Sequence, residues 1–210
     1  MMPQLEFRRL GIRDYAATMD EMRSWTQARA PNTADEIWFL QHEPVYTQGV
    51  SCSESVREGG TDIPLVKSDR GGQITYHGPG QLVAYMLLDL RRLGLGVRQL
   101  VSLMEASVIE VLDQFGLEAV ARPGAPGVYI NGEKIAALGL RVRSGCCYHG
   151  LSLNVDMELE PFSRIDPCGF AGLGVTSLKG QGVSVNVDEA ADALQEILEI
   201  RLSHKKTDSP

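Results

Sequence analysis

Several features that would place a chain in a specialised class are missing from this sequence. Its longest apolar run, Leu82 to Leu90, is far too short to cross a membrane and is interrupted by Asp89. The first residues, MMPQLEFRRLG, lack the apolar stretch of a secretory signal. The net charge is −7, without the excess of lysine and arginine that neutralises nucleic-acid phosphates. These absences predict a cytoplasmic globular protein that binds neither a membrane nor a nucleic acid.

The four cysteines also lack the spacing of a disulfide framework or a zinc site. Cys146 and Cys147 are adjacent, whereas Cys52 and Cys168 stand alone. Zinc ligands usually come in close pairs such as C-x2-C, and no such pair is present. The pattern favours reduced thiols in the cytoplasm and predicts that the protein holds no metal.

Hydrophobic periodicity predicts an α/β (α+β) fold, a single domain over residues 1–210 with a mixed, largely antiparallel sheet and flanking helices. Helices are expected over Ile12–Arg29, over Val97–Phe115 and from an N-cap at Asp188 to Leu202, before a frayed tail over 203–210. The Asn131-Gly132 pair predicts a β-hairpin turn. Further strands are expected at 37–42, 45–47, 63–67, 73–76, 82–90 and 147–155.

The most unusual stretch is RGGQITYHGPGQ, from Arg70 to Gln81. Glycines lie at both ends of a short predicted strand, and a long apolar strand follows. Such glycines either form a tight hairpin in an ordinary sheet or let the backbone approach a bound molecule closely. On these residues alone both interpretations stay open.

Cys168 and Lys134 are the candidate reactive groups. Cys168 lies between Pro167 and Gly169, which favours an accessible sulfur on a rigid turn, although a free cysteine is more often a small buried side chain. Lys134 directly follows the predicted hairpin turn and precedes an apolar strand. It is either a solvated surface charge or a buried cation that stabilises the Cys168 thiolate and shuttles a proton.

Two histidines offer an alternative partner for Cys168. His77 and His149 are each followed by glycine, and each lies at or near a predicted strand end. Either could act as a base toward a cysteine nucleophile, so a Cys–His pair rivals the Cys–Lys pair on pattern alone.

Four segments, in this order, resemble the octanoyltransferases of lipoate biosynthesis: RGGQITYHGPGQL, GVYINGEKIAALGLRVR, YHGLSLNV and FSRIDPCG. The match covers most of the chain, from about Leu5 to beyond Thr176. The resemblance implies the fold of lipoate–protein ligase and biotin protein ligase catalytic domains. It also implies that an octanoyl group passes from acyl carrier protein to an enzyme cysteine. From there it passes to a lysine of a lipoyl domain of a 2-oxoacid dehydrogenase E2 subunit, or of glycine-cleavage H protein, with no separate cofactor.

The resemblance assigns family roles to particular residues. The acyl-thioester cysteine corresponds to Cys168, and the lysine that lowers its pKa corresponds to Lys134. The substrate-binding segments correspond to Arg70, Gly71, Gly72, Gln73, Ile74, Thr75, Tyr76 and His77, to Ala137, Leu138 and Gly139, and to Gly150, Leu151 and Ser152. Related sequences often carry a small hydroxyl residue where this chain has Ala137, so a contact there must come from the backbone.

Two other functions stay open. An ATP-dependent lipoate or biotin ligase of the same fold would need no enzyme cysteine, and a non-catalytic module would bind a carrier protein without reacting. The negative net charge also conflicts with an acidic carrier protein as donor. We hypothesise that a local basic patch overrides it, formed by Arg91, Arg92, Arg141 and Arg143.

Overall fold

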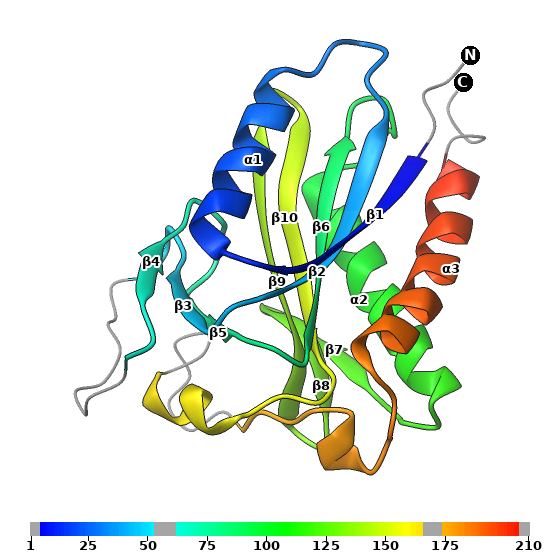
Figure 1. Cartoon of the computed structure of the whole chain (residues 1–210). Coiled ribbons are helices and arrows are strands. Elements are labelled where there is room, and N and C mark those ends of the chain that lie inside the picture. The colour runs from blue at the N-terminus through cyan, green and yellow to red at the C-terminus, as the bar shows by residue number, and fades with distance from the viewer. Residues whose placement is uncertain (1–4, 53–61, 166–173, 206–210) are drawn as a thin grey trace.

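The computed structural model describes residues 5–52, 62–165 and 174–205. A seven-stranded mixed sheet forms its centre, as Figure 1 shows. In spatial order its strands are β1 (Leu5–Arg13), β2 (Asp35–His42), β6 (Gln81–Asp89), β10 (Cys146–Asn154), β9 (Glu133–Arg143), β8 (Ala125–Ile130) and β7 (Val120–Arg122). The β1–β2 pair is parallel and every other pair in this sheet is antiparallel. The mixed α/β fold with a largely antiparallel sheet is thus confirmed.

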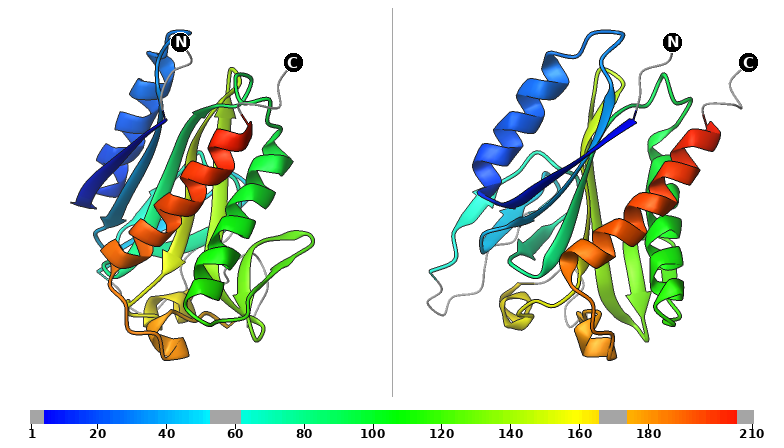
Figure 2. Two further views of the ribbon diagram at one scale, coloured as in Figure 1. Left: turned by 90° about the vertical axis from the view of Figure 1, so that its right-hand side faces the viewer. Right: turned by 45° about the vertical axis from the view of Figure 1, so that its right-hand side comes forward.

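Helices cover both faces of this sheet (Figure 2). Helices α2 (Val97–Gln114) and α3 (Val187–Lys205) pack side by side on one face and enclose the main apolar core. Helix α1 (Tyr15–Gln27) covers the other face and buries Tyr15, Met19 and Met22 in a second, smaller cluster. None of the helices in the described part of the chain is long and apolar enough to cross a membrane.

A second sheet of three strands lies beside the first, in the order β4 (Leu65–Lys67), β3 (Val45–Gln48) and β5 (Ile74–His77). The strand predicted near residue 74 and the long apolar strand that follows it are therefore not a hairpin, because β5 and β6 belong to different sheets. Gly80 lies in the turn between them, with φ +84° and its backbone against the Asp156 carbonyl. A Cβ at Gly80 would lie 1.8 Å from that oxygen, so this turn needs a glycine.

Most predicted elements are present with shifted ends. The β8–β9 hairpin is confirmed, since Asn131 and Gly132 both have positive φ, at 49° and 94°. Strand β1 was not predicted, and the first helix begins at Tyr15 because Asp14 accepts a hydrogen bond from the Ala17 N–H. The N-cap predicted at Asp188 is wrong. Asn186 caps α3 instead, through the Glu189 N–H.

Helix α3 also extends beyond its predicted end and reaches Lys205, so residues 203–205 are helical rather than a frayed tail. Residues 206–210 lie outside the described part. Two short 3-10 helices, η1 (Glu160–Arg164) and η3 (Lys179–Gln181), complete the described elements.

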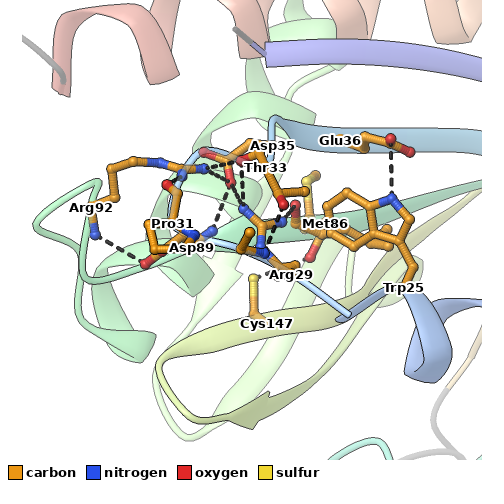
Figure 3. A network of polar contacts seen from close by, with 12 residues as sticks. Trp25, Arg29, Pro31, Thr33, Asp35, Glu36, Met86, Asp89, Arg92 and Cys147 are labelled. Carbon is orange, nitrogen blue, oxygen red and sulfur yellow. Dashed lines mark hydrogen bonds and ion pairs between the residues drawn. The ribbon is translucent and has the colours of Figure 1, made fainter. Parts of the chain in front are cut away.

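A buried ion-pair network fixes one end of the sheet (Figure 3). The Asp35 carboxylate accepts hydrogen bonds from Arg29 at 2.6 Å, from Arg92 at 2.7 Å and from the Asp89 N–H at 2.8 Å. These contacts join the loop after α1 to the start of β2 and the end of β6. Arg92 is therefore committed to a structural network.

Candidate active site

A cavity of about 410 Å³ lies at the edge of β9. The β8–β9 ladder ends at the Gly127–Ala137 pair, so the rest of β9 has no described strand on that side. The glycine-rich loop covers this edge, since the Gly71 N–H donates to the Leu140 carbonyl at 2.9 Å. A Cβ on Gly139 would lie 2.9 Å from the Gly71 carbonyl oxygen, so glycine there permits the close approach.

The cavity has an apolar part and a polar part. Its apolar wall includes residues from the start of α2 and from β9 and β10, namely Val97, Val101, Leu138, Leu140 and Leu151. Its polar wall comes from α1, β5, β6 and β10 and includes Tyr15, His77, Gln81, Tyr85, His149, Ser152 and Asn154. A slot of this volume, mostly apolar with a few polar groups, is typical of small-molecule sites.

Lys134 lines the same cavity and is 4% exposed. Its ammonium donates to the Pro126 carbonyl at 3.2 Å and lies 5.2 Å from the centroid of the Tyr129 ring. A β-bulge explains this inward position. Val128 pairs with Ala136 but Tyr129 pairs with Lys134, so Ile135 is the extra residue. Of the two interpretations of Lys134 that the sequence left open, the structure shows the buried one, and its role toward Cys168 stays a prediction.

The two histidines of the cavity are buried and neutral. Burial lowers the pKa of His77 well below its usual value, and its Nδ1 donates to Gln81 Oε1 at 2.6 Å. Burial also lowers the pKa of His149, against the effect of Asp69, whose carboxylate accepts from Nε2 at 2.9 Å. A lowered pKa makes both rings weak bases near neutral pH, which weakens the Cys–His alternative.

Asp69 does not line the cavity, but its carboxylate holds residues of the polar wall in place through hydrogen bonds. Burial alone would raise its pKa, but hydrogen bonds from His149, Tyr148 and Arg23 hold that pKa well below its usual range. Its oxygens lie 2.5 Å from the Tyr148 hydroxyl and 3.0 Å from the Arg23 Nε. The ionised carboxylate fixes the His149 ring, whose backbone has φ +59°.

The structure brings the predicted binding segments together. Every residue of the three segments lines the cavity except Tyr76, which packs against Tyr46 and Phe162 in a separate cluster. The Arg70 guanidinium donates to the Thr47 carbonyl at 2.7 Å and to the Gly71 carbonyl at 3.0 Å, so it also fixes the loop. Substrate binding by these residues stays a prediction.

Several cavity residues were missed by the sequence analysis. Tyr15 was predicted only as part of a helix face, and the segment Gly124–Pro126 was not singled out. No short-range pattern identifies them, because the cavity combines elements far apart in the chain. Cys168 lies outside the described residues, as do Asp166, Pro167 and Gly169.

The hypothesised basic patch is smaller than predicted. Arg92 is paired with Asp35, as described above, whereas Arg91, Arg141 and Arg143 are exposed. Arg141 and Arg143 lie at the end of β9 that is remote from Lys134. At about 3.3 Å per residue, Arg141 is roughly 23 Å from Lys134 along the strand.

Comparisons with known proteins agree on one family. A family model described as the lipoyl protein ligase A/B catalytic domain matches residues 14–199. An octanoyltransferase of Pseudomonas putida (strain W619) is 52% identical over 191 residues, covering 91% of this chain and 89% of the relative. An octanoyltransferase of Psychromonas ingrahamii is 50% identical over 206 residues, covering 98% and 95%. The chain belongs to the octanoyltransferase family.

Solved structures of ligases share the fold of this octanoyltransferase-family chain. A bipartite lipoate protein ligase from Thermoplasma acidophilum has a TM-score of 0.72 at 20% identity, over 97% of this chain and 84% of that one. Biotin protein ligase from Aquifex aeolicus has a TM-score of 0.56 at 14% identity, over 100% and 73%. At such identities the likeness shows the fold alone, and it confirms the predicted relation to both ligase folds.

Proposed function

We propose that this chain transfers an octanoyl group from the thioester of an acyl carrier protein to a lysine of a lipoyl domain. Octanoyltransferases about 50% identical over nearly its whole length support this acyltransferase activity in protein lipoylation. The observation that carries the chemistry is Lys134, a buried ammonium at the wall of a cavity of about 410 Å³.

The proposed reaction has two steps. The Cys168 thiolate attacks the carrier thioester, a new enzyme thioester forms, and the carrier thiol leaves with a proton from Lys134. The amine of the acceptor lysine then attacks the enzyme thioester, an amide forms, and the Cys168 thiolate is released. Lys134 takes up the proton that the amine loses. Forming an amide from a thioester is downhill, so the second step commits the acyl group.

The described residues on either side of 166–173 support a role for Cys168 at this cavity. Ile165 packs in one cluster with Phe162, which lines the cavity. On the other side, the Gly174 carbonyl accepts from the Lys134 N–H at 2.8 Å, and Val175 lines the cavity. The described residues that flank 166–173 on both sides therefore lie at the same cavity.

The apolar wall suits an acyl chain. Burying six or seven methylenes is worth about 5 kcal/mol at about 0.8 kcal/mol each. One methylene fewer then weakens binding about fourfold, so short chains are rejected only weakly and long ones are excluded by the cavity wall. Leu138 lines this slot, whereas the apolar side chains of Leu82, Ala84 and Ile135 belong to the main core.

The partners follow from the same chemistry. We propose acyl carrier protein as donor, and as acceptors the lipoyl domains of 2-oxoacid dehydrogenases and glycine-cleavage H protein. The acyl group arrives already activated as a thioester, so the proposed reaction needs neither ATP nor a separate cofactor. Family membership favours this reaction over the ATP-dependent ligase alternative, which shares only the fold.

Intact-protein mass spectrometry after mixing with octanoyl-carrier protein tests the proposal. We expect an octanoyl adduct on the unaltered chain and on Cys146→Ala, and no adduct on Cys168→Ala. Subsequent addition of a lipoyl domain should remove the adduct and octanoylate the domain. An ATP-dependent ligase would keep its activity in Cys168→Ala, and a binding module would never gain mass. Absence of the adduct in the unaltered chain would refute the proposal.

A further inference from the structure

Strand β8 presents two groups to the Lys134 ammonium, the Pro126 carbonyl and the Tyr129 ring. The bulge at Ile135 places Lys134 opposite Tyr129, and cross-strand partners share a face of the sheet. The ammonium donates to the Pro126 carbonyl and lies over the Tyr129 ring, at 3.2 Å and 5.2 Å. An aromatic face and a carbonyl oxygen both attract an ammonium group.

Gly127 provides the space for this arrangement. It has φ +145°, and a Cβ there would lie 3.0 Å from Cε and 3.2 Å from Nζ of Lys134. The Gly127 N–H donates to Glu105 Oε1 at 3.0 Å, which ties this part of β8 to helix α2. Any side chain at Gly127 would therefore meet the end of the lysine.

We propose that Tyr129 is a positioning residue for Lys134, supported by Gly127 and Glu105. Its ring fixes the Lys134 ammonium at the cavity wall. Tyr129 is 1% exposed, and its hydroxyl donates to the Ala125 carbonyl at 3.0 Å, so the ring itself has little freedom. The proposal rests on the proposed role of Lys134 in octanoyl transfer, and adds a residue that acts through it.

Two substitutions separate the ring from the hydroxyl. Tyr129→Leu removes the aromatic face, whereas Tyr129→Phe keeps it and loses only the hydrogen bond to Ala125. We expect the rate of acyl-enzyme formation at neutral pH to fall about tenfold in Tyr129→Leu and to stay within about twofold in Tyr129→Phe. The acidic limb of the pH profile should move to higher pH in Tyr129→Leu, because the thiolate loses a fixed cation.

A double-mutant cycle tests whether Tyr129 acts through Lys134. In a Lys134→Ala background, Tyr129→Leu should cause no further loss of rate, since the group it positions is already gone. Phe39→Leu is the matched control, because Phe39 is also a buried ring with a cation over it, Arg9 at 4.7 Å, but lies outside the cavity lining. It should lower stability and leave the pH profile in place.

A readout without acyl transfer keeps this inference separate from the proposed function. In protein labelled with carbon-13 lysine, the Lys134 side-chain signals, assigned by their loss in Lys134→Ala, should be shifted upfield by the Tyr129 ring. That shift should persist in Tyr129→Phe and vanish in Tyr129→Leu. An unshifted Lys134 signal, or equal rate losses from Tyr129→Leu with and without Lys134, would overturn the positioning role. A missing octanoyl adduct would overturn only the proposed function.

Discussion

Burying a lysine that is only 4% exposed is costly unless polar groups replace the water it has lost. Lys134 has such groups in the Pro126 carbonyl and the Tyr129 ring. The proposed chemistry asks two things of this side chain. As an ammonium it stabilises a thiolate, and as an amine it accepts a proton from the acceptor lysine.

Lys134→Arg separates these two tasks. A guanidinium is always protonated, so it can stabilise the thiolate but cannot accept a proton. We expect acyl-enzyme formation to fall about tenfold or less, and transfer to the lipoyl domain to fall at least a hundredfold. Time-resolved intact mass spectrometry would then show the octanoyl-enzyme accumulating.

Lys179→Arg is the control for the change of side chain, because Lys179 is an exposed residue paired with Asp156. It should leave both steps at the unaltered rate. Equal loss of the two steps in Lys134→Arg would contradict the division of tasks and favour a single electrostatic role.

At the scale of elements, a chain of buried hydrogen bonds connects the glycine-rich segment to Lys134. His77 contacts Gln81, and the Gln81 amide donates to Asn154 Oδ1 at 2.9 Å. Asn154 then donates to the Thr176 carbonyl at 2.9 Å, and the Thr176 N–H donates to the Lys134 carbonyl at 3.0 Å. The relay fixes the short segment after residue 173 against β9 and β10, beside the cavity.

Asn154→Ala should break this relay. Gln81 and the Thr176 carbonyl would each lose a buried partner, which costs about 1–3 kcal/mol of the free energy of unfolding. We also expect acyl-enzyme formation to slow at least fivefold, because the segment at Thr176 beside Lys134 loses its hydrogen bond to Asn154. Urea unfolding and single-turnover acylation measure the two effects.

Asn186→Ala is the matched control for stability. It removes the α3 cap, which costs about 1 kcal/mol, and lies outside the cavity lining. Its acylation rate should be unchanged. If Asn154→Ala were as destabilised as Asn186→Ala and equally active, the relay would have no role in placing the site.

The element scale also shows how far the sequence could predict this site. Helix α2 and the β8–β9 hairpin follow local signals, namely a 3.6-residue apolar period and an Asn-Gly turn, and both were predicted. The division of β5 and β6 between two sheets was not, because strand pairing depends on partners distant in the chain. The bulge at Ile135 was not predicted either, although the family resemblance had already assigned a role to Lys134. Buried and exposed residues alternate only weakly in strand β1. The strand pairs with β2 in parallel, so no hairpin turn connects the two and no turn signal marks β1.

For the whole molecule, three buried histidines lie close together between the two sheets and α1. The rings of His42 and His77 have centroids 5.8 Å apart, and Tyr85 contacts both His42 and His149. Burial lowers the pKa of His42 to about 4 and lowers the pKa of His77 and His149 as well. The folded protein therefore holds all three rings neutral where the unfolded chain would protonate them.

This difference predicts a loss of stability in mild acid. Below about pH 6.5 these histidines bind protons in the unfolded chain but not in the folded protein. The free energy of unfolding therefore falls as the pH drops from about 6.5 toward about 4. One pH unit below 6.5, His42 contributes a loss of about 1.4 kcal/mol, because its folded pKa is about 4, and His77 and His149 change stability in the same direction. Urea unfolding at pH 7.5 and pH 5.5 measures this loss. In His42→Gln the loss should be smaller by about 1.4 kcal/mol, because the folded protein no longer excludes a proton from His42. If the free energy of unfolding fell between pH 7.5 and pH 5.5 by the same amount in His42→Gln as in the unaltered chain, His42 would not contribute to the acid sensitivity.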